Sequence, residues 1–298
     1  MNPQNNITLT DKFIAALDEV YSVESRTARL ESDSIMVQRT ADGKSWKIAK
    51  LLLQGAGTYS RTTGFPKGAI TLEWESFTFE NDRGREFNVD AMDNQETLNL
   101  IVANILSQFL REEIVPEMDA IRFAKYYAQA GEKLEETITT PDAAATSLNA
   151  SLEKMAANGV PAEGKFIYIS NAFYSLLRKS VVRTTFNNDG YINTGIRDWD
   201  GNELVAVPDS RFHTTLTLLD GTSEDQAQGG YTPTGVVMNY LIIDKRAVVQ
   251  ITKHQALRVF APDVNQEMDA WKIQYRVYHD AWVLPQKKIG VVASAPAA

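Results

Sequence analysis

The chain has no cysteine among its 298 residues and only three histidines. The absence of cysteine excludes disulfides, thiolate metal sites and a cysteine nucleophile. His213, His254 and His279 lie far apart without HExxH spacing, and there is no GxSxG nucleophile elbow. His279 falls on the inward parity of a predicted strand, which favours a core or interface histidine over a ligand or a base. Because no catalytic constellation remains, we expect the protein not to be an enzyme.

Long apolar runs and an excess of positive charge are also missing. No run approaches the roughly 20 residues that a membrane-spanning helix needs, and the start MNPQNNITLTDKF has neither a basic nor an apolar signal region. We therefore expect a soluble protein made in the cytoplasm, with no membrane partner. The formal net charge of −8 argues against tight nonspecific binding to nucleic acid, because such binding needs Lys and Arg to displace counterions.

Short motifs that resemble ligand sites fail on their spacing. Residues 43–45, GKS, resemble the end of a phosphate loop, yet Gln38 stands where the first glycine belongs. This segment is better explained as a hairpin turn. Residues 198–203 resemble a calcium loop, but the glycine comes fourth where the sharp turn needs it sixth, so a β-turn is favoured. Neither motif predicts a cofactor.

A long helix is predicted near the centre of the chain. Asp93 and Glu96 form a capping box, and over 94–114 the apolar residues recur at the i, i+3, i+4, i+7 spacing of one buried stripe. Pro116 either kinks this helix or stands in the first turn of a second one. The acidic group of Asp90, Asp93 and Glu96 is explained better by capping and a solvated face than by a divalent ion. We therefore expect a helical rod and no metal.

Residues 8–22 predict an amphipathic helix near the N-terminus. Phe13, Leu17 and Tyr21 fall on its apolar face. Since isolated short helices are marginally stable, this face needs a surface to cover. That surface is either its own domain or a neighbouring subunit, and both remain open.

Residues 33–90 predict strands and turns. A hairpin turn is expected at 41–44, a polar Gly-rich tip at 58–68, an alternating strand at 70–79, and a turn at 82–84 before a short strand. Both faces of the strand at 70–79 carry large apolar groups and charges, which suits a ribbon between two surfaces. A two-stranded ribbon is at best marginally stable in water. If it projects from its domain, something else must hold it.

Beyond Gly131, which is suited to cap the second helical run, the pattern changes. A helix begins after Thr140 and ends at Asn158-Gly159, and short strands and turns follow. The polar loop at 222–230 is expected to be mobile. This alternation predicts a compact α/β unit over about 138–250.

The last part of the chain predicts long regular strands. Residues 271–283 alternate between apolar and polar over more than twice the usual strand length of about 5 to 6 residues. Their expected partner is 255–261. Long strands beside a long helix predict an elongated domain that is discontinuous in sequence, with the α/β unit inserted.

Several segments resemble a known family. DRGREFNVDAMDNQET and LREEIVPEMDAIRFAKYY resemble the segment that leads into and along the spine helix in major capsid proteins of tailed bacteriophages, which share the Hong Kong-type phage capsid fold. LTDKFIAALDEVYSVES, GFPKGAITLEWESFTFEND, KFIYISNAFYSLLRKS and GNELVAVPDSRF agree in kind and order, so the resemblance covers nearly the whole chain. It rests on no short diagnostic motif.

The resemblance implies an α+β fold divided into parts that the pattern above also predicts. These are an N-terminal arm (1–32), an extended loop or β-hairpin with flanking strands (33–90), a peripheral domain with the spine helix (91–137), an inserted α/β axial domain (138–250), and the C-terminal strands of the peripheral domain's long sheet (251–298). The chain begins almost directly at the arm, without the long N-terminal scaffolding region of some relatives. No cross-linking residue is placed by motif.

The function implied is structural. Many copies would assemble as pentamers and hexamers into an icosahedral head that encloses double-stranded DNA without sequence-specific binding. Portal and scaffolding proteins are the expected partners, and the virion, assembled in the host bacterial cytoplasm, is the expected location. Two alternatives stay open: an encapsulin-like bacterial nanocompartment shell, and a soluble two-domain enzyme with its site between the domains. The candidate subunit-interface residues are Phe13, Leu17, Tyr21, Tyr59, Arg61, Phe65, Lys67, Trp74, Arg83 and Arg85.

Overall fold

The computed structural model describes residues 25–32, 37–39, 45–62, 64–92, 108–180, 185–186, 192–193 and 195–297. Some of the predicted features lie outside these residues. They are the N-terminal helix over 8–22, the hairpin turn at 41–44, the capping box of Asp93 and Glu96, and most of the helix over 94–114.

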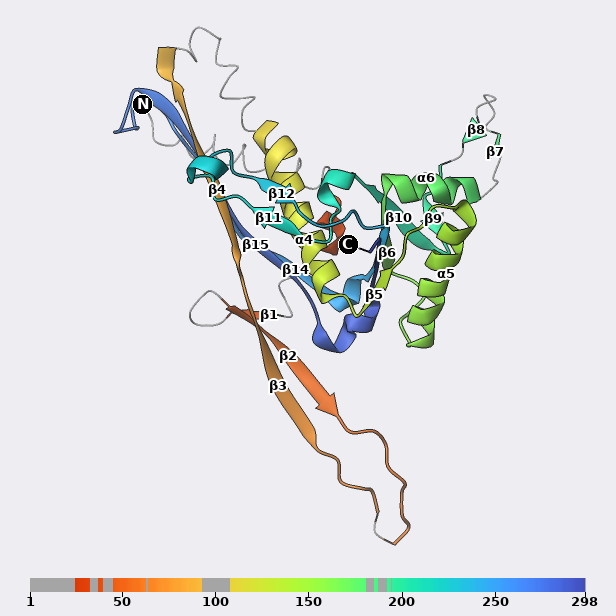
Figure 1. The fold of residues 1–298 in the computed structure, drawn as a ribbon. Helices are drawn as coiled ribbons and strands as arrows, with labels where there is room; N and C mark the ends of the chain where they lie inside the picture. Colours follow the sequence, from red (N-terminus) through yellow and green to blue (C-terminus); the bar gives the residue numbers. More distant parts are fainter. Residues whose placement is uncertain are drawn as a thin grey trace.

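A long three-stranded antiparallel sheet forms one half of the body (Figure 1). Its strands are β14 (Val248–Phe260), β15 (Ala270–Val283) in the middle, and β4 (Asn81–Asp90). The predicted strand at 271–283 and its partner at 255–261 are confirmed. Along β15, alternate residues from Ile273 to Val283 are buried because one face of the sheet is covered by a helix.

That covering helix is α4 (Val115–Gln129), which directly follows a π-helical turn at Leu110–Ile114. Ile114 and Val115 keep helical backbone angles, so the chain runs on through Pro116 without a break. Pro116 stands in the first turn of α4, as one of the two alternatives predicted. A proline has no N–H to donate to the preceding turn, and the wider π turn lies where that bond is missing.

A mixed six-stranded sheet forms the other half, with the strand order β5-β16-β13-β6-β10-β9. Its inserted part begins with α5 (Pro141–Ala157), where Thr140 Oγ1 accepts from the N–H of Ala143 and caps the helix as predicted. A second helix, α6 (Asn171–Ser180), follows β6 directly. The strands are β5 (Glu132–Glu135), β6 (Lys165–Ser170), β9 (Asp198–Trp199), β10 (Asn202–Val207), β13 (Tyr240–Asp244) and β16 (Val291–Ala295).

The two faces of this sheet bury different cores. Ile167, Ile169 and Ile242 pack with α5 and α6, whereas Tyr168 and Leu241 pack with α4. Helix α4 therefore contacts both sheets, because the turn before it and its start pack on the long sheet while its second half packs on the six-stranded one.

Small sheets complete the described residues. β11 (Leu216–Leu218) pairs with β12 (Tyr231–Pro233), and β7 (Thr185–Phe186) pairs with β8 (Ile192–Asn193). β1 (Val37–Arg39), β2 (Ser45–Leu53) and β3 (Ile70–Thr78) form an antiparallel ribbon that projects far from the body (Figure 1).

The structure differs from the sequence prediction in where the C-terminal residues lie. The predicted range 251–298 is divided, because β16 pairs with β13 and β5 inside the six-stranded sheet while β14 and β15 form the long sheet. β5 also lies outside the predicted inserted range, 138–250. A strand this short and apolar carries no signal of which sheet it joins.

Two local predictions were wrong. Residues 82–84 do not turn; they continue β4, because β15 supplies a partner strand along the whole of Asn81–Asp90. Gly131 does not cap α4 in a left-handed conformation, since Ala130 is the C-cap residue. Gly131 is needed for close approach: a Cβ there would lie 2.2 Å from the carbonyl oxygen of Lys288.

Candidate interaction surfaces

The projecting ribbon of β2 and β3 carries an apolar face along β3. Trp74, Leu72 and Ile70 alternate with polar residues along this strand, so their side chains lie on one side of the ribbon. Trp74, Leu72 and Ile70 are 44%, 54% and 73% exposed. The other side of β3 carries Thr71, Glu73 and Glu75, with Phe77 at its base, so the large apolar group predicted for that side lies where the ribbon meets the body.

The tip of the ribbon has its own local structure. Ser60 and Gly64 exchange backbone hydrogen bonds of 3.1 and 2.8 Å, and Gly64 supplies the positive φ, +81°, that this tight turn needs. The rings of Tyr59 and Phe65 lie 4.9 Å apart. Even so, Tyr59 is 56% and Phe65 83% exposed, and Arg61 and Lys67 are exposed beside them. We call Tyr59, Arg61, Phe65 and Lys67 the hairpin tip.

The base of the ribbon is fixed to the body by aromatic packing. Phe77 and Phe79, at and just beyond the end of β3, are buried against Trp282 with ring centroids 5.5 and 5.0 Å away. The ring of Tyr278 lies 5.2 Å from that of Phe79. The ribbon is therefore held at one end while its apolar face stays open to solvent.

Arg83 binds inside the molecule. Its guanidinium donates to both carboxylate oxygens of Glu117 on α4, at 2.6 and 3.2 Å, and to the carbonyls of Leu219 and Gly230 at 2.8 and 3.0 Å. Such bidentate geometry is the strongest form of Arg–carboxylate contact. Arg83 thus ties β4, α4 and the loop at 219–230 together, and these bonds assign it an intramolecular role.

The loop at 219–230 contains the polar loop predicted at 222–230, and it has several internal hydrogen bonds. Asp220 accepts backbone hydrogen bonds from Thr222 and Ser223 at 2.8 and 2.9 Å and one from the Ser223 hydroxyl. These bonds lower the pKa of Asp220 to about 2, with the Ser223 hydroxyl contributing most. Arg85 also donates to the carbonyl of Ala227 at 3.2 Å. The polar composition suggested mobility because side-chain bonds of this kind cannot be distinguished from solvation by sequence alone.

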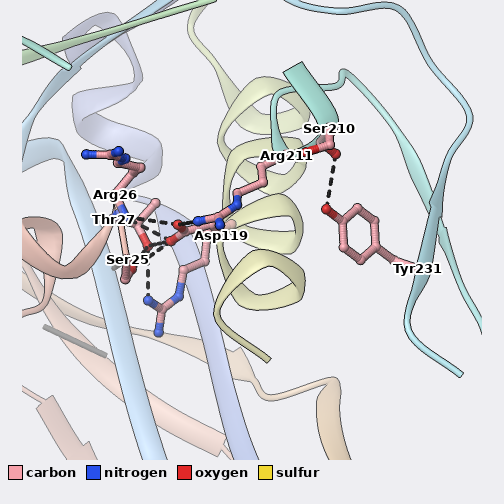
Figure 2. A network of polar contacts seen from close by, with 8 residues as sticks. Ser25, Arg26, Thr27, Asp119, Ser210, Arg211 and Tyr231 are labelled. Carbon is pink, nitrogen blue, oxygen red and sulfur yellow. Dashed lines mark hydrogen bonds and ion pairs between the residues drawn. The ribbon is translucent and has the colours of Figure 1, made fainter. Parts of the chain in front are cut away.

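A buried polar network anchors residues 25–32 to α4 (Figure 2). The carboxylate of Asp119, fully buried, accepts from Ser25 Oγ at 2.7 Å, Arg26 N at 2.9 Å and Thr27 Oγ1 at 2.7 Å. Arg211 approaches the same carboxylate at 3.4 Å. Since a buried carboxylate is costly unless it is paired and hydrogen-bonded, this network fixes Ser25, Arg26 and Thr27 against α4.

Sequence analysis missed Asp119 and Arg122 as buried residues. Phe123 and Tyr126 are fully buried on this helix as well, whereas Ala124 and Tyr127 are only partly buried. The available signal was the charge pattern: Glu117, Asp119 and Arg122 cannot all lie on one solvent face of a helix. Helix α4 is instead covered on nearly every side, with its charges paired internally.

His279 was correctly predicted to point inward. It is fully buried, opposite Thr252 and Asn81 in the neighbouring strands. Within the described part of the chain, neither ring nitrogen has a hydrogen-bond partner. Burial, reinforced by the charges of Arg122, Lys125 and Arg83, lowers the pKa of His279 well below its usual value. The ring is therefore neutral at physiological pH and packs as part of the buried core.

The described residues hold no group of His, Asp or Glu arranged to bind a metal ion. In the same residues, no helix is long and apolar enough to cross a membrane. A hollow of about 590 Å³ lies between β4, the π turn and the loop at 219–230, and Arg83, Glu113 and Glu117 line it. Those groups are ion-pair partners and charges, without a nucleophile beside a base.

The predicted interface residues thus fall into distinct places. Tyr59, Arg61, Phe65 and Lys67 lie together at the hairpin tip, and Trp74 lies on the apolar face of the ribbon. Arg83 and Arg85 bind the loop at 219–230. Phe13, Leu17 and Tyr21 lie outside the described residues.

Comparison with known proteins identifies the fold. No family model and no curated protein matches the sequence. Solved structures do match along nearly the whole chain. The mature capsid of bacteriophage PhiM1 matches with a TM-score of 0.61 and 11% identity, over 87% of this chain and 83% of that one. The capsid structure of cyanophage P-SCSP1u matches with a TM-score of 0.58 and 14% identity, over 90% and 86%.

A virus-like particle from Pyrococcus furiosus matches with a TM-score of 0.57 and 11% identity, over 96% of this chain and 99% of that one. The chain therefore has the mixed α+β fold of tailed-phage capsid structures, as the resemblance implied. Its division into arm, loop, peripheral and axial parts stays a prediction.

Proposed function

We propose that this chain is a major capsid protein, a structural protein that assembles in many copies into the icosahedral head of a tailed bacteriophage. The observation that carries the proposal is the ribbon of β2 and β3. A projecting two-stranded ribbon with an open apolar face is marginal in a single chain, and the fold is one that phage capsids use. The ribbon's apolar face is covered when it lies over an adjacent subunit.

Assembly proceeds through pentamers and hexamers, in which heterologous contacts close by rotation. Each contact is modest, but a subunit that engages several neighbours at once stays in the lattice through high effective concentration. In this proposal the N-terminal arm contacts a further neighbour, and the described part of the arm, residues 25–32, is anchored to α4 by the Asp119 network. Portal and scaffolding proteins complete the set of partners in the host cytoplasm, and the finished shell belongs to the virion.

The contents of the shell are double-stranded DNA held without sequence recognition. A net charge of −8 keeps the protein from adhering to the packaged genome. The second candidate function is a nanocompartment shell without a genome, favoured by the likeness to the virus-like particle from Pyrococcus furiosus. Nuclease-protected DNA inside particles purified from their natural source supports the phage head, whereas particles that hold only protein support the compartment.

Deletion of residues 59–67 tests the ribbon's role. We expect the truncated chain to fold, because most of the described residues in this stretch are exposed and Phe77 still packs on Trp282, but to form no closed shells. Electron microscopy and sedimentation of the expressed protein measure this directly. The control is Glu153→Ala, at an exposed position of α5, which should leave shells intact. Normal particles from the 59–67 deletion would refute the role of the ribbon.

A further inference from the structure

Two of the connections between the sheets lie side by side. The 3₁₀ turn η6 (Lys245–Ala247) joins β13 of the six-stranded sheet to β14 of the long sheet, and η7 (Pro285–Gly290) joins β15 back to β16. The two turns are in contact, and the N–H of Leu284 donates to the carbonyl of Ala247 at 2.8 Å. Figure 1 shows η7 as the dark-blue turn at the lower edge of the body. A group bound between these turns therefore touches both crossings from one sheet to the other.

A surface hollow of about 280 Å³ opens between the two turns and the residues that follow α5. Its walls include the apolar side chains of Val160, Pro161, Ala247 and Ile289. Ile289 is 48% exposed, so its apolar surface is open to a molecule that enters the hollow. Small-ligand sites are mostly apolar, with a few polar groups that fix orientation, and their volumes begin at about 300 Å³. We call this space the crossover hollow.

Close backbone packing gives the crossover hollow a fixed shape. The N–H of Gly131, just beyond α4, donates to the carbonyl of Lys288 at 3.1 Å. A Cβ at Gly290 would lie only 2.7 Å from that of Ala247, so glycine is needed for the two turns to approach this closely. A ligand that enters a preformed site loses little affinity to reorganisation of the protein.

The rim of the crossover hollow is basic, on a chain whose net charge is −8. Arg246 and Lys287 line it, and Lys245 and Lys288 are exposed beside them. None of the three lysines pairs with a carboxylate among the described residues. The carboxylate in the lining, Asp244, is already engaged, because its Oδ1 accepts from N and Nε of Arg246 at 3.1 and 3.0 Å. The lysines therefore present positive charge that the fold does not neutralise.

We propose that the crossover hollow binds a small anionic amphiphile, a carboxylate or sulfate on a short alkyl chain. The alkyl chain packs on Ile289 and Val160, and the anionic head accepts charge-assisted hydrogen bonds from Lys287 and Lys288. An inorganic anion would leave the apolar walls in water, and an uncharged alkyl compound would leave the lysines without a partner. The bound molecule bridges η6 and η7 and so holds the two sheets in one relative orientation. This inference does not depend on the proposed shell.

Sodium octanoate is the probe, titrated into the full chain by calorimetry, with octanol as its uncharged match. We expect octanoate to bind at least about tenfold more tightly, because hydrogen bonds to a charged group are stronger than neutral ones. Lys287→Gln with Lys288→Gln should remove this advantage and leave octanol binding unchanged. The matched control is Arg178→Gln with Lys179→Gln, an exposed basic pair at the end of α6, which should bind octanoate as the unmodified chain does. Equal binding of octanoate by both double variants overturns the proposal.

Hydrogen exchange followed by mass spectrometry locates the bound probe. Saturating octanoate should slow exchange in residues 244–247 and 286–290 and leave the ribbon strands β2 and β3 unchanged. The ribbon is the necessary comparison because its exposed apolar face also offers a surface to an alkyl chain. Ile289→Ser, at an exposed position, should weaken octanoate and octanol alike. Protection confined to the ribbon overturns the proposal, and so does binding to free subunits that is lost in assembled particles, since a neighbouring subunit would then cover the hollow.

Discussion

At the scale of single residues, buried charged side chains join parts of the fold that the periodicity of apolar residues does not connect. Asp119 and Arg122 are both fully buried, and both bind Thr27 through Oγ1. The carbonyl oxygen of Thr27 also accepts a hydrogen bond from Gln250 Nε2 at 3.0 Å. One threonine thus joins residues 25–32, α4 and β14. Removing the Asp119 carboxylate leaves several donors without this acceptor, which is the costly case for buried polar groups.

Asp119→Ala should destabilise the folded chain strongly. It leaves Ser25 Oγ, Arg26 N and Thr27 Oγ1 without their acceptor, and we expect a loss of about 3 to 5 kcal/mol in the free energy of unfolding. Urea denaturation of the unassembled chain measures this. Glu153→Ala, on the exposed side of α5, is the control and should change stability by less than about 0.5 kcal/mol. Equal midpoints for the two variants would show that the network contributes little.

His279 should make the chain sensitive to acid. Its pKa is lowered by burial in the folded state, so the unfolded chain binds a proton first as the pH falls below about 6.5. The contribution of this group to the free energy of unfolding is therefore complete above that pH and is lost progressively as the pH falls below it.

His279→Leu should flatten the pH dependence of the urea midpoint between pH 7.5 and 5.5. The substitution removes the titrating ring, whose nitrogens have no partner among the described residues. His254→Leu, at an exposed position of β14, is the control and should keep the slope. If His279→Leu retains the full slope, another group carries the acid sensitivity.

At the scale of elements, the ribbon of β2 and β3 separates folding from assembly. Ile70, Leu72 and Trp74 on its apolar face are exposed and belong to no core cluster of the described residues, whereas Phe77, on the other face, packs on Trp282. The elements that do fold the body are tied to each other by α4, which touches both sheets.

Leu72→Glu should abolish shell formation while leaving the monomer folded. Leu72 is exposed on the apolar face, so a charge there costs the monomer less than about 0.5 kcal/mol but opposes burial under a neighbour. Thr71→Glu, one residue earlier and on the opposite face, is the matched control and should assemble. Sedimentation and electron microscopy distinguish the two. Shells from both variants would mean that the apolar face is not the buried one.

At the scale of the whole molecule, the sequence was sufficient to predict the long elements that have a regular apolar pattern and lie within the described residues. The alternation along 271–283, the cap at Thr140 and the ribbon at 70–78 were all predicted, because each is written in a local pattern. The membership of β16 in the six-stranded sheet and the order of the loop at 219–230 were not. These depend on partners more than 60 residues away or on side-chain bonds, which local periodicity does not encode. The candidate interface residues Tyr59, Arg61, Phe65 and Lys67 gather at the hairpin tip because they are close in the sequence, and their role in assembly stays a prediction.

Assembly should raise the thermal stability of the chain. Neighbours bind folded subunits only, so a lattice contact stabilises the native state by mass action, by about 2.7 kcal/mol when the free subunit is at 100 times its dissociation constant. For a chain of this size that corresponds to a rise of about 5 to 10 °C in the unfolding midpoint. Calorimetry of purified shells and of the unassembled Leu72→Glu variant measures the difference. The unfolding midpoint of the variant should not depend on protein concentration. Identical midpoints for shell and variant would show that contacts between neighbours do not stabilise the folded chain.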